Sequence, residues 1–145
     1  MRLLLFFLLF AHALSAQTDS LPPASTDTSK VYEAFDVDKP PVFPGGESEM
    51  LKFISKNIQY PQLAREKGTQ GSVICEAVVE KDGRLSNIKI YRDIGDGCGE
   101  ELVRVIGLMP VWEPGTRQGN KVRVRQIIAA RFKLEGDKKK KKSKN

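Results

Sequence analysis

The most reactive side chains in this sequence are two thiols, Cys75 and Cys98, its only cysteines. They lie 23 residues apart, and both occupy apolar-face positions of the elements predicted below. A disulfide would join a strand to the start of a helix, and the chain-entropy model gives such a loop about 3 kcal/mol of stabilisation. The alternative is two buried free thiols that pack as small apolar side chains. The sequence leaves both alternatives open.

Histidine chemistry is confined to one position, because His12 is the only histidine. This residue falls in a predicted leader, so the exported protein has no imidazole base and no histidine metal ligand. Activation of a serine or cysteine nucleophile by histidine is therefore excluded. Two cysteines without histidine do not form an ordinary zinc site either.

The glycine-rich segment Gly95–Gly99 precedes a predicted helix, as a phosphate-binding loop would. Glu100 stands where the G-x-G-x-x-G pattern requires its last glycine, and no strand–helix–strand unit surrounds the segment. We interpret it as a simple connection. No nucleophile, base and orienting group can be combined elsewhere, so we predict that the protein is not an enzyme and uses no cofactor or metal ion.

Residues 1–16 have the three parts of a secretory signal peptide. Arg2 precedes an apolar run, and small side chains surround the expected cleavage site at Ala16. The apolar stretch of about 14 residues is shorter than the roughly 20 that a membrane-spanning helix needs. We therefore favour cleavage and export over retention of the leader as a membrane anchor.

Composition divides the remaining chain into three parts. Residues 17–41 are rich in Pro, Ser, Thr and Asp, and we interpret them as a flexible linker. Residues 42–135 are long enough for one small domain. Residues 136–145 form a tail with six lysines, which either touches anionic surfaces of the cell envelope or only aids solubility.

The formal net charge of +6 comes from the tail rather than from the domain. The leader contributes one arginine and the tail six lysines, so residues 17–137 carry a net charge of −1. A nucleic-acid-binding domain needs a basic folded face, and we therefore predict no nucleic-acid partner.

Hydrophobic periodicity predicts three helices. Apolar side chains at helical spacing, together with an acidic first turn, indicate a helix over residues 47–57. Pro61 suits the first position of a short second helix that ends near Gly68. A third helix follows the glycine-rich segment and ends at Pro110.

Alternating apolar residues predict three strands. Residues 72–80 and 84–92 flank Asp82 and Gly83, whose positive φ values would form a tight hairpin. Residues 121–134 alternate apolar and basic side chains, as expected of a strand with one face on the core. The element order predicts an α+β fold, in which a three-stranded, largely antiparallel sheet carries two to three helices on one face. Such a sheet has two open edges, and an open edge is either protected or used.

Several of these features, taken in order, resemble the C-terminal domain of the TonB family. They are the Tyr60-Pro61 pair, the strand that ends at Asp82-Gly83, the segment Val111–Gly115 and the terminal strand. The segment Phe43–Gly46 looks like the branch of the family in which this domain has an extra N-terminal helix. The resemblance covers about residues 42–135, which is nearly the whole predicted domain.

The resemblance implies a periplasmic domain that binds TonB-dependent outer-membrane transporters. In that family the domain captures a short extended segment of the transporter, the TonB box, and transmits force generated at the inner membrane. An exposed strand edge can accept such a segment through main-chain hydrogen bonds. The corresponding strand here is Val122–Leu134, and the partner-binding residues that we predict in it are Val122, Arg123, Val124, Arg125 and Gln126.

The same resemblance assigns roles outside the terminal strand. Arg65, on the short second helix, matches a position that lies near the receptor's periplasmic face. Tyr60 and Trp112 are interpreted as scaffold aromatics, since aromatics inside apolar segments usually pack in the core. The predicted structural residues are Tyr60, Pro61, Asp82, Gly83, Trp112 and Pro114.

The sequence departs from a full energy transducer, which has an N-terminal membrane anchor and a long charged, proline-rich spacer. Here the leader looks cleavable, and a linker of about 25 residues spans at most about 80–90 Å. One hypothesis is a TonB-like module that engages transporters for energy-coupled transport, with an inner-membrane complex as its anchor. The alternative is a soluble envelope-binding or assembly module that does not transduce energy.

Overall fold

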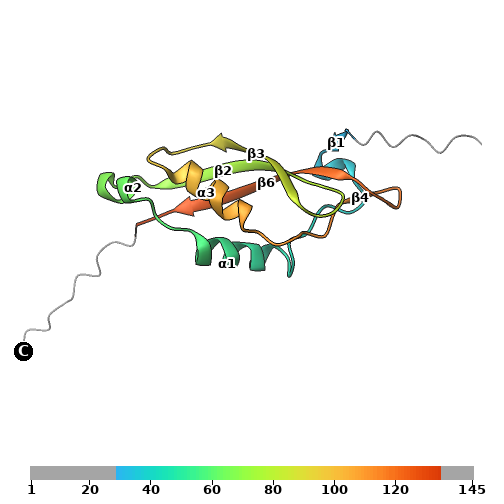
Figure 1. The fold of residues 1–145 in the computed structure, drawn as a ribbon, viewed down its shortest axis with the longest axis horizontal. Coiled ribbons are helices and arrows are strands. Elements are labelled where there is room, and N and C mark those ends of the chain that lie inside the picture. Colours follow the sequence, from blue (N-terminus) through green and yellow to red (C-terminus); the bar gives the residue numbers. More distant parts are fainter. Residues whose placement is uncertain (1–28, 135–145) are drawn as a thin grey trace, which may run out of the picture.

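The computed structural model describes residues 29–134, so the predicted leader and lysine tail lie outside the described residues. A sheet of strand order β1-β6-β2-β3 forms the centre of the described part (Figure 1). Its strands are β1 (Val31–Tyr32), β2 (Gly71–Val79), β3 (Leu85–Arg92) and β6 (Arg123–Phe132). The helices are α1 (Glu47–Asn57), α2 (Gln62–Lys67), α3 (Cys98–Gly107) and a 3-10 turn, η1 (Ala34–Asp36). A separate hairpin consists of β4 (Thr116–Arg117) and β5 (Asn120–Lys121).

The α+β fold class is confirmed, and the three long strands form the predicted antiparallel unit. β2 lies between β3 and β6 and pairs antiparallel with both. In the β2–β6 ladder, Val73 lies opposite Ala130 and Cys75 opposite Ile128, and these side chains are buried. The alternation in sequence therefore places one apolar face of the sheet against the helices.

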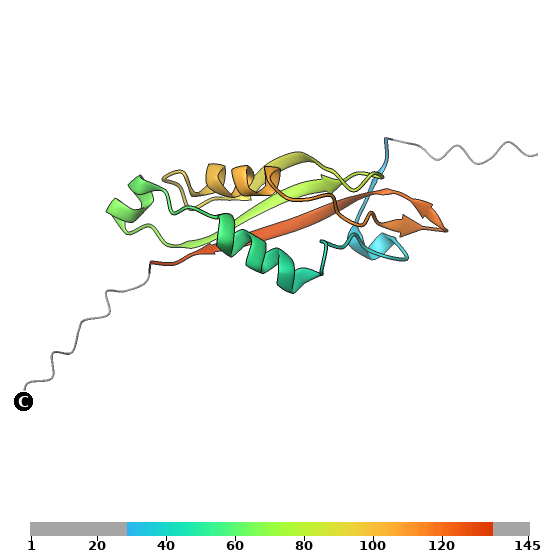
Figure 2. The same cartoon turned by 60° about the horizontal axis from the view of Figure 1, so that its bottom comes forward.

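The helices α1 and α3 supply the other half of the core (Figure 2). α1 has the predicted bounds, and it buries Met50 and Ile54, which lie one turn apart. α3 buries Leu102 and Ile106 in the same way but ends at Gly107 rather than at Pro110. The residue before a proline avoids helical backbone angles, so the helix ends before the chain reaches Pro110.

The short helix α2 begins one residue later than predicted. Pro61 has a ψ of 140°, so it is the N-cap, and Gln62 is the first helical residue. Gly68 ends the helix in the left-handed conformation with a φ of 69°. This conformation lets the backbone N–H of Thr69 donate to the carbonyl oxygen of Ala64 at 2.8 Å.

The turn between β2 and β3 differs from the predicted two-residue hairpin in one respect. Gly83 has a positive φ of 84°, whereas Asp82 does not. The N–H of Gly83 donates to the Glu80 carbonyl, and the N–H of Glu80 donates to the Arg84 carbonyl, each at 2.8 Å. This is a longer loop closed by a single left-handed residue, and the Asp82 side chain accepts a bond from the Arg84 N–H at 3.0 Å.

The predicted scaffold aromatics pack as edge-to-face pairs. Trp112 is 3% exposed and meets Phe43 with ring centroids 5.6 Å apart. Tyr60 meets Phe132, the last residue of β6, at 5.5 Å, and its hydroxyl donates to the Thr69 carbonyl. The first pair holds the segment before α1 against the segment after α3, and the second holds the segment before α2 against β6.

Residues 29–42, which we call the N-terminal arm, correct the predicted extent of the linker. β1 in this arm pairs parallel with β6, and Val42 exchanges backbone hydrogen bonds with Glu113 at 2.9 and 3.0 Å. Lys39 is bridged to Thr116 in the same manner. A polar segment lacks apolar side chains for a core of its own, but it can be ordered by backbone bonds to strands that already exist.

Gly83 and Trp112 make a close backbone contact that joins two motifs of the sequence. The N–H of Trp112 donates to the Gly83 carbonyl at 2.8 Å. A Cβ added to Gly83 would lie 1.9 Å from the Trp112 carbonyl oxygen. Glycine is therefore required here both by its positive φ and by the lack of space.

Replacing this glycine is expected to destabilise the domain strongly. Gly83→Ala should lower the melting temperature by more than about 10 °C, because a backbone atom must move to relieve the clash. Gly119→Ala is the matched control, since Gly119 has a similar φ of 75° with no atom near its added Cβ. Thermal unfolding followed by circular dichroism measures both, and equal losses would contradict the role of the Gly83–Trp112 contact.

Candidate protein-binding site

The candidate site is the edge of β6 that faces away from β2. β1 covers this edge only at Arg123 and Val124. Within residues 29–134 no other strand pairs with β6 on this side, and we call residues 125–132 the open edge. The predicted binding residues are therefore divided between the covered part and the open edge, to which Arg125 and Gln126 belong. Val122 precedes the strand and is buried, with its N–H bonded to the Gly115 carbonyl at 2.9 Å.

A hollow of about 430 Å³ adjoins the start of the open edge. Gln126 and Ile127 both line it, and successive strand residues point to opposite faces, so the hollow lies at the edge itself. Ile127 is 50% exposed. The other lining residues come from the arm, from α1 and from the scaffold: Ala34, Pro40, Pro41, Val42, Phe43, Glu47, Met50 and Trp112.

Arg123 lies on the outer face of β6, as predicted, but it already has an acidic partner in its own chain. Its Nε and Nη2 atoms donate to the two carboxylate oxygens of Glu80 at 2.7 and 2.9 Å. Its Nη1 atom donates to the Ser29 carbonyl at 2.9 Å. The hydrogen bonds from Arg123 lower the pKa of the Glu80 carboxyl, although burial opposes the shift.

Arg125 is the second predicted arginine, and its side chain bonds both to β2 and to the N-terminal arm. Its Nη1 atom donates to Glu76 on β2, and its Nε atom donates to Glu33 of the arm at 2.8 Å. The bond from Arg125 lowers the pKa of Glu76. The Arg125 side chain is still 38% exposed, so a carboxylate from another chain could reach it.

Arg65 lies apart from the predicted residues at the start of β6. It is exposed on α2, which follows Tyr60, and Tyr60 packs against Phe132 at the far end of β6. The ten residues of β6 span about 30 Å. The structure therefore places Arg65 near one end of the strand and Val122–Gln126 at the other.

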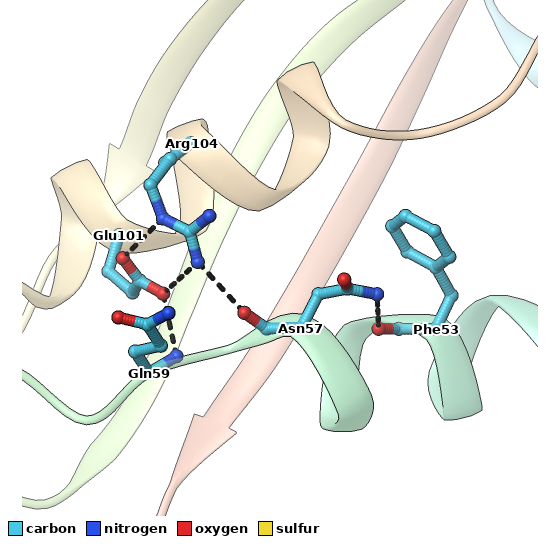
Figure 3. Close-up of polar contacts among 5 residues, drawn as sticks. All are labelled: Phe53, Asn57, Gln59, Glu101 and Arg104. Atoms are coloured by element: carbon cyan, nitrogen blue, oxygen red, sulfur yellow. Dashed lines mark hydrogen bonds and ion pairs between the residues drawn. The ribbon is translucent and has the colours of Figure 1, made fainter.

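A group of polar contacts, the polar node, joins the end of α1 to α3 (Figure 3). Arg104 donates through Nη2 to the Asn57 carbonyl at 2.8 Å and to Glu101 at 2.7 Å. Glu101 also accepts from the Gln59 N–H at 2.6 Å, and the bonds from Arg104 lower its pKa. The node satisfies a carbonyl at the end of α1 and so joins this end of the helix to α3. Sequence reasoning missed it, although the Glu101–Arg104 spacing of three was a signal.

The two thiols are buried and free in the structure, on β2 and at the first residue of α3. Burial raises the pKa of both, and Asp93 adds to the shift in each case. A neutral thiol without solvent access is a poor nucleophile. The geometry thus gives Cys75 and Cys98 a role in packing.

The part of the chain that the structure describes offers neither a side-chain cluster for a metal ion nor a helix that could span a membrane. Residues 29–134 contain no group of three or more acidic, cysteine or histidine side chains that could hold a metal ion. In the same range, none of the helices is both long and apolar enough to cross a membrane.

The family model described as Gram-negative bacterial TonB protein C-terminal matches residues 56–134, more than half of the chain. The chain belongs to this family. The family consists of periplasmic, non-catalytic domains that bind outer-membrane receptors. No curated protein matches the chain.

Solved structures of TonB C-terminal domains are also similar to the chain. The Pseudomonas aeruginosa domain is 22% identical, with a TM-score of 0.44, over 55% of this chain and 80% of that one. Two Helicobacter pylori domains of different length are 20% and 24% identical, both with a TM-score of 0.44. They cover 62% and 65% of this chain, and 95% and 89% of their own.

The Glu80–Arg123 pair predicts a specific dependence of stability on pH. The pKa of Glu80 is lower in the folded protein than in the unfolded chain, so its ionised carboxylate stabilises the folded state at pH values above the ordinary carboxyl pKa of about 4.3. This contribution to stability is lost as the pH falls through the lowered pKa. Glu80→Gln should lower the melting temperature at pH 7 by about 4–8 °C, corresponding to about 1 kcal/mol. The difference from wild type should shrink below about pH 4. Glu49→Gln is the control, since its pair with Lys52 is largely exposed, and a pH-independent loss in Glu80→Gln would refute the pairing.

The thiols give a second prediction. In the native protein at pH 7.5, neither Cys75 nor Cys98 should react with iodoacetamide, because both are fully buried and their pKa values are raised. After denaturation without reductant, mass spectrometry should show two alkylated cysteines. A mass lower by two hydrogens, with no alkylation, would instead establish a disulfide.

Proposed function

We propose that this chain is a periplasmic binding module for TonB-dependent outer-membrane transporters in energy-coupled transport. The transporter's extended TonB-box segment would add to the sheet as a strand beside β6. The observation that carries this proposal is the open edge at residues 125–132, with a hollow beside it, in a chain of the TonB C-terminal family. Anchoring would come from a separate inner-membrane complex, and the lysine-rich tail would touch anionic surfaces of the envelope.

The backbone of the open edge supplies the affinity in this proposal. Eight residues at about 3.3 Å each give an edge of about 25 Å. In an antiparallel ladder, alternate residues of β6 direct their N–H and C=O groups toward β2, and the others direct them outward. An added strand would bond to the outward set, which is how extended peptides bind to sheet edges.

Side chains near the edge would contribute selectivity. The hollow at Gln126 and Ile127 offers apolar walls to one side chain of the added strand. The exposed part of Arg125 favours an acidic residue nearby. Arg65 would contact the receptor away from the added strand.

Proline substitutions test the strand-addition mechanism. Gln126→Pro and Ile127→Pro alter successive residues, so one removes an outward N–H and the other an N–H used by β2. The variant that keeps its circular dichroism spectrum and melting temperature identifies the outward position. This variant should bind peptides from the N-termini of co-expressed outer-membrane receptors about 10-fold more weakly than wild type, as measured by titration calorimetry.

Gln126→Ala and Ile127→Ala are the matched controls, because they keep the backbone N–H and remove most of the side chain. They separate the loss of a ladder bond from the loss of a side-chain contact. If wild type binds none of the receptor peptides, or the folded proline variant binds them as well as wild type, strand addition is wrong. The envelope-assembly alternative would then be favoured.

A further inference from the structure

The first part of the N-terminal arm occupies the β6 edge in the way that an added strand would. β1 pairs with β6 in parallel, with Val31 opposite Arg123 and Tyr32 opposite Val124. The pairing stops after two residues, directly before the open edge. Residues that looked like linker in the sequence therefore cover the start of the surface that the proposed function requires.

The side chains of this segment match those of β6 and of the β4–β5 hairpin. Glu33 accepts a bond from Arg125 Nε at 2.8 Å. Two cations lie over the ring of Tyr32, with Lys30 Nζ 4.8 Å and the Arg117 guanidinium carbon 5.2 Å from its centroid. An aromatic residue followed by an acid is thus the chemistry that this part of the edge recognises.

We propose that residues 29–36 are an internal ligand of the β6 edge, which a partner strand displaces when it binds. This inference rests on the proposed function and specifies its ligand. The partner would be an extended segment parallel to β6, with an aromatic residue opposite Val124 and a carboxylate beside Arg125. The segment 29–36 thereby regulates access to the site.

The contacts of this segment are weak enough for displacement. Residues 29–36 include no buried side chain, and Phe35 is 85% exposed. The Glu33–Arg125 pair is 41% and 38% exposed, and ion pairs at such exposure stabilise little. Two residues of parallel pairing add few backbone bonds.

Residues 38–43, which follow this segment, are held much more firmly, so residues 29–36 can be released without them. The N–H of Asp38 donates to the Thr116 carbonyl at 2.9 Å, and Val42 and Glu113 exchange bonds. Phe43 is 6% exposed and belongs to the core. Residues 29–36 can therefore leave the edge while residues 38–43 keep their place.

Displacement would also enlarge the site in a defined way. Ala34 lines the hollow beside Gln126 and Ile127, so its departure opens one wall. Arg125 would keep its bond to Glu76 and lose Glu33, which leaves it free to take the partner's carboxylate. The uncovered edge would then run without interruption from Arg123 to Phe132.

The experiment compares three variants of the full-length chain with wild type. Val31→Pro with Tyr32→Pro removes both N–H groups of β1 and should release the segment. Val31→Thr with Tyr32→Phe is the matched control, since it keeps the backbone groups, the branched side chain and the ring. Glu33→Lys is a second releasing variant that places a like charge beside Arg125 and leaves the backbone unchanged.

Two measurements are made on each chain. Hydrogen exchange followed by NMR should show faster exchange in both releasing variants at those amides of Arg123–Arg125 that face β1, with the β2–β3 amides unchanged. A synthetic peptide with the sequence of residues 29–36 should bind the proline variant about 10-fold more tightly than wild type or the control, because the site is no longer occupied.

The outcomes separate this inference from the proposed function. Unchanged exchange at Arg123–Arg125, or equal binding of the peptide to all chains, would overturn the internal ligand. Receptor peptides that bind wild type and releasing variants equally would leave the proposed function standing and refute the inference. If the peptide of residues 29–36 binds the released protein while no receptor peptide binds any chain, residues 29–36 still act as an internal ligand, but the proposed function fails and with it displacement by a transporter strand.

Discussion

The antiparallel ladder between β2 and β6 is the constraint on which the rest of the structure depends. It runs through nine residue pairs, from Gly71–Phe132 to Val79–Val124. Strand side chains alternate between the faces, so a slip of one residue would turn the whole apolar set outward. The ladder fixes the core that α1 and α3 cover, and it also determines which edge of β6 remains for a partner.

The same ladder explains why the basic outer face of β6 is not a simple acid-binding surface. It places Arg125 beside Glu76 of β2 and Arg123 beside Glu80, the residue that follows β2, and both arginines bond to these carboxylates. The charge that a partner could still use is the exposed part of Arg125, where Glu33 of the arm now lies. In the proposed function, recognition at this edge would therefore depend mainly on backbone bonds, with one charged position adding selectivity.

Sequence reasoning succeeded where the structural signal is local. The bounds of α1, the β2–β3–β6 unit and the role of Gly83 follow from periodicity, capping and turn chemistry, which need few distant contacts. β1 could not be predicted in this way, because a strand of two residues carries no periodicity. Its conformation depends on pairing with the edge of β6, which follows much later in the sequence. The Arg104 node was missed for a related reason, since its carbonyl partner, Asn57, lies 47 residues away.

In the proposed function, the arm would resolve a conflict between protecting the β6 edge and using it to bind a partner strand. A fully covered β6 could not bind an extended segment, whereas a fully open one would invite pairing with unrelated strands. A tethered strand competes at an effective concentration of about millimolar, so a weak or very short partner strand does not displace it. A partner that pairs along the open edge as well gains bonds that the two-residue β1 cannot match. Partial coverage thus favours long, complementary segments over short ones, which is selectivity obtained from competition rather than from additional contacts.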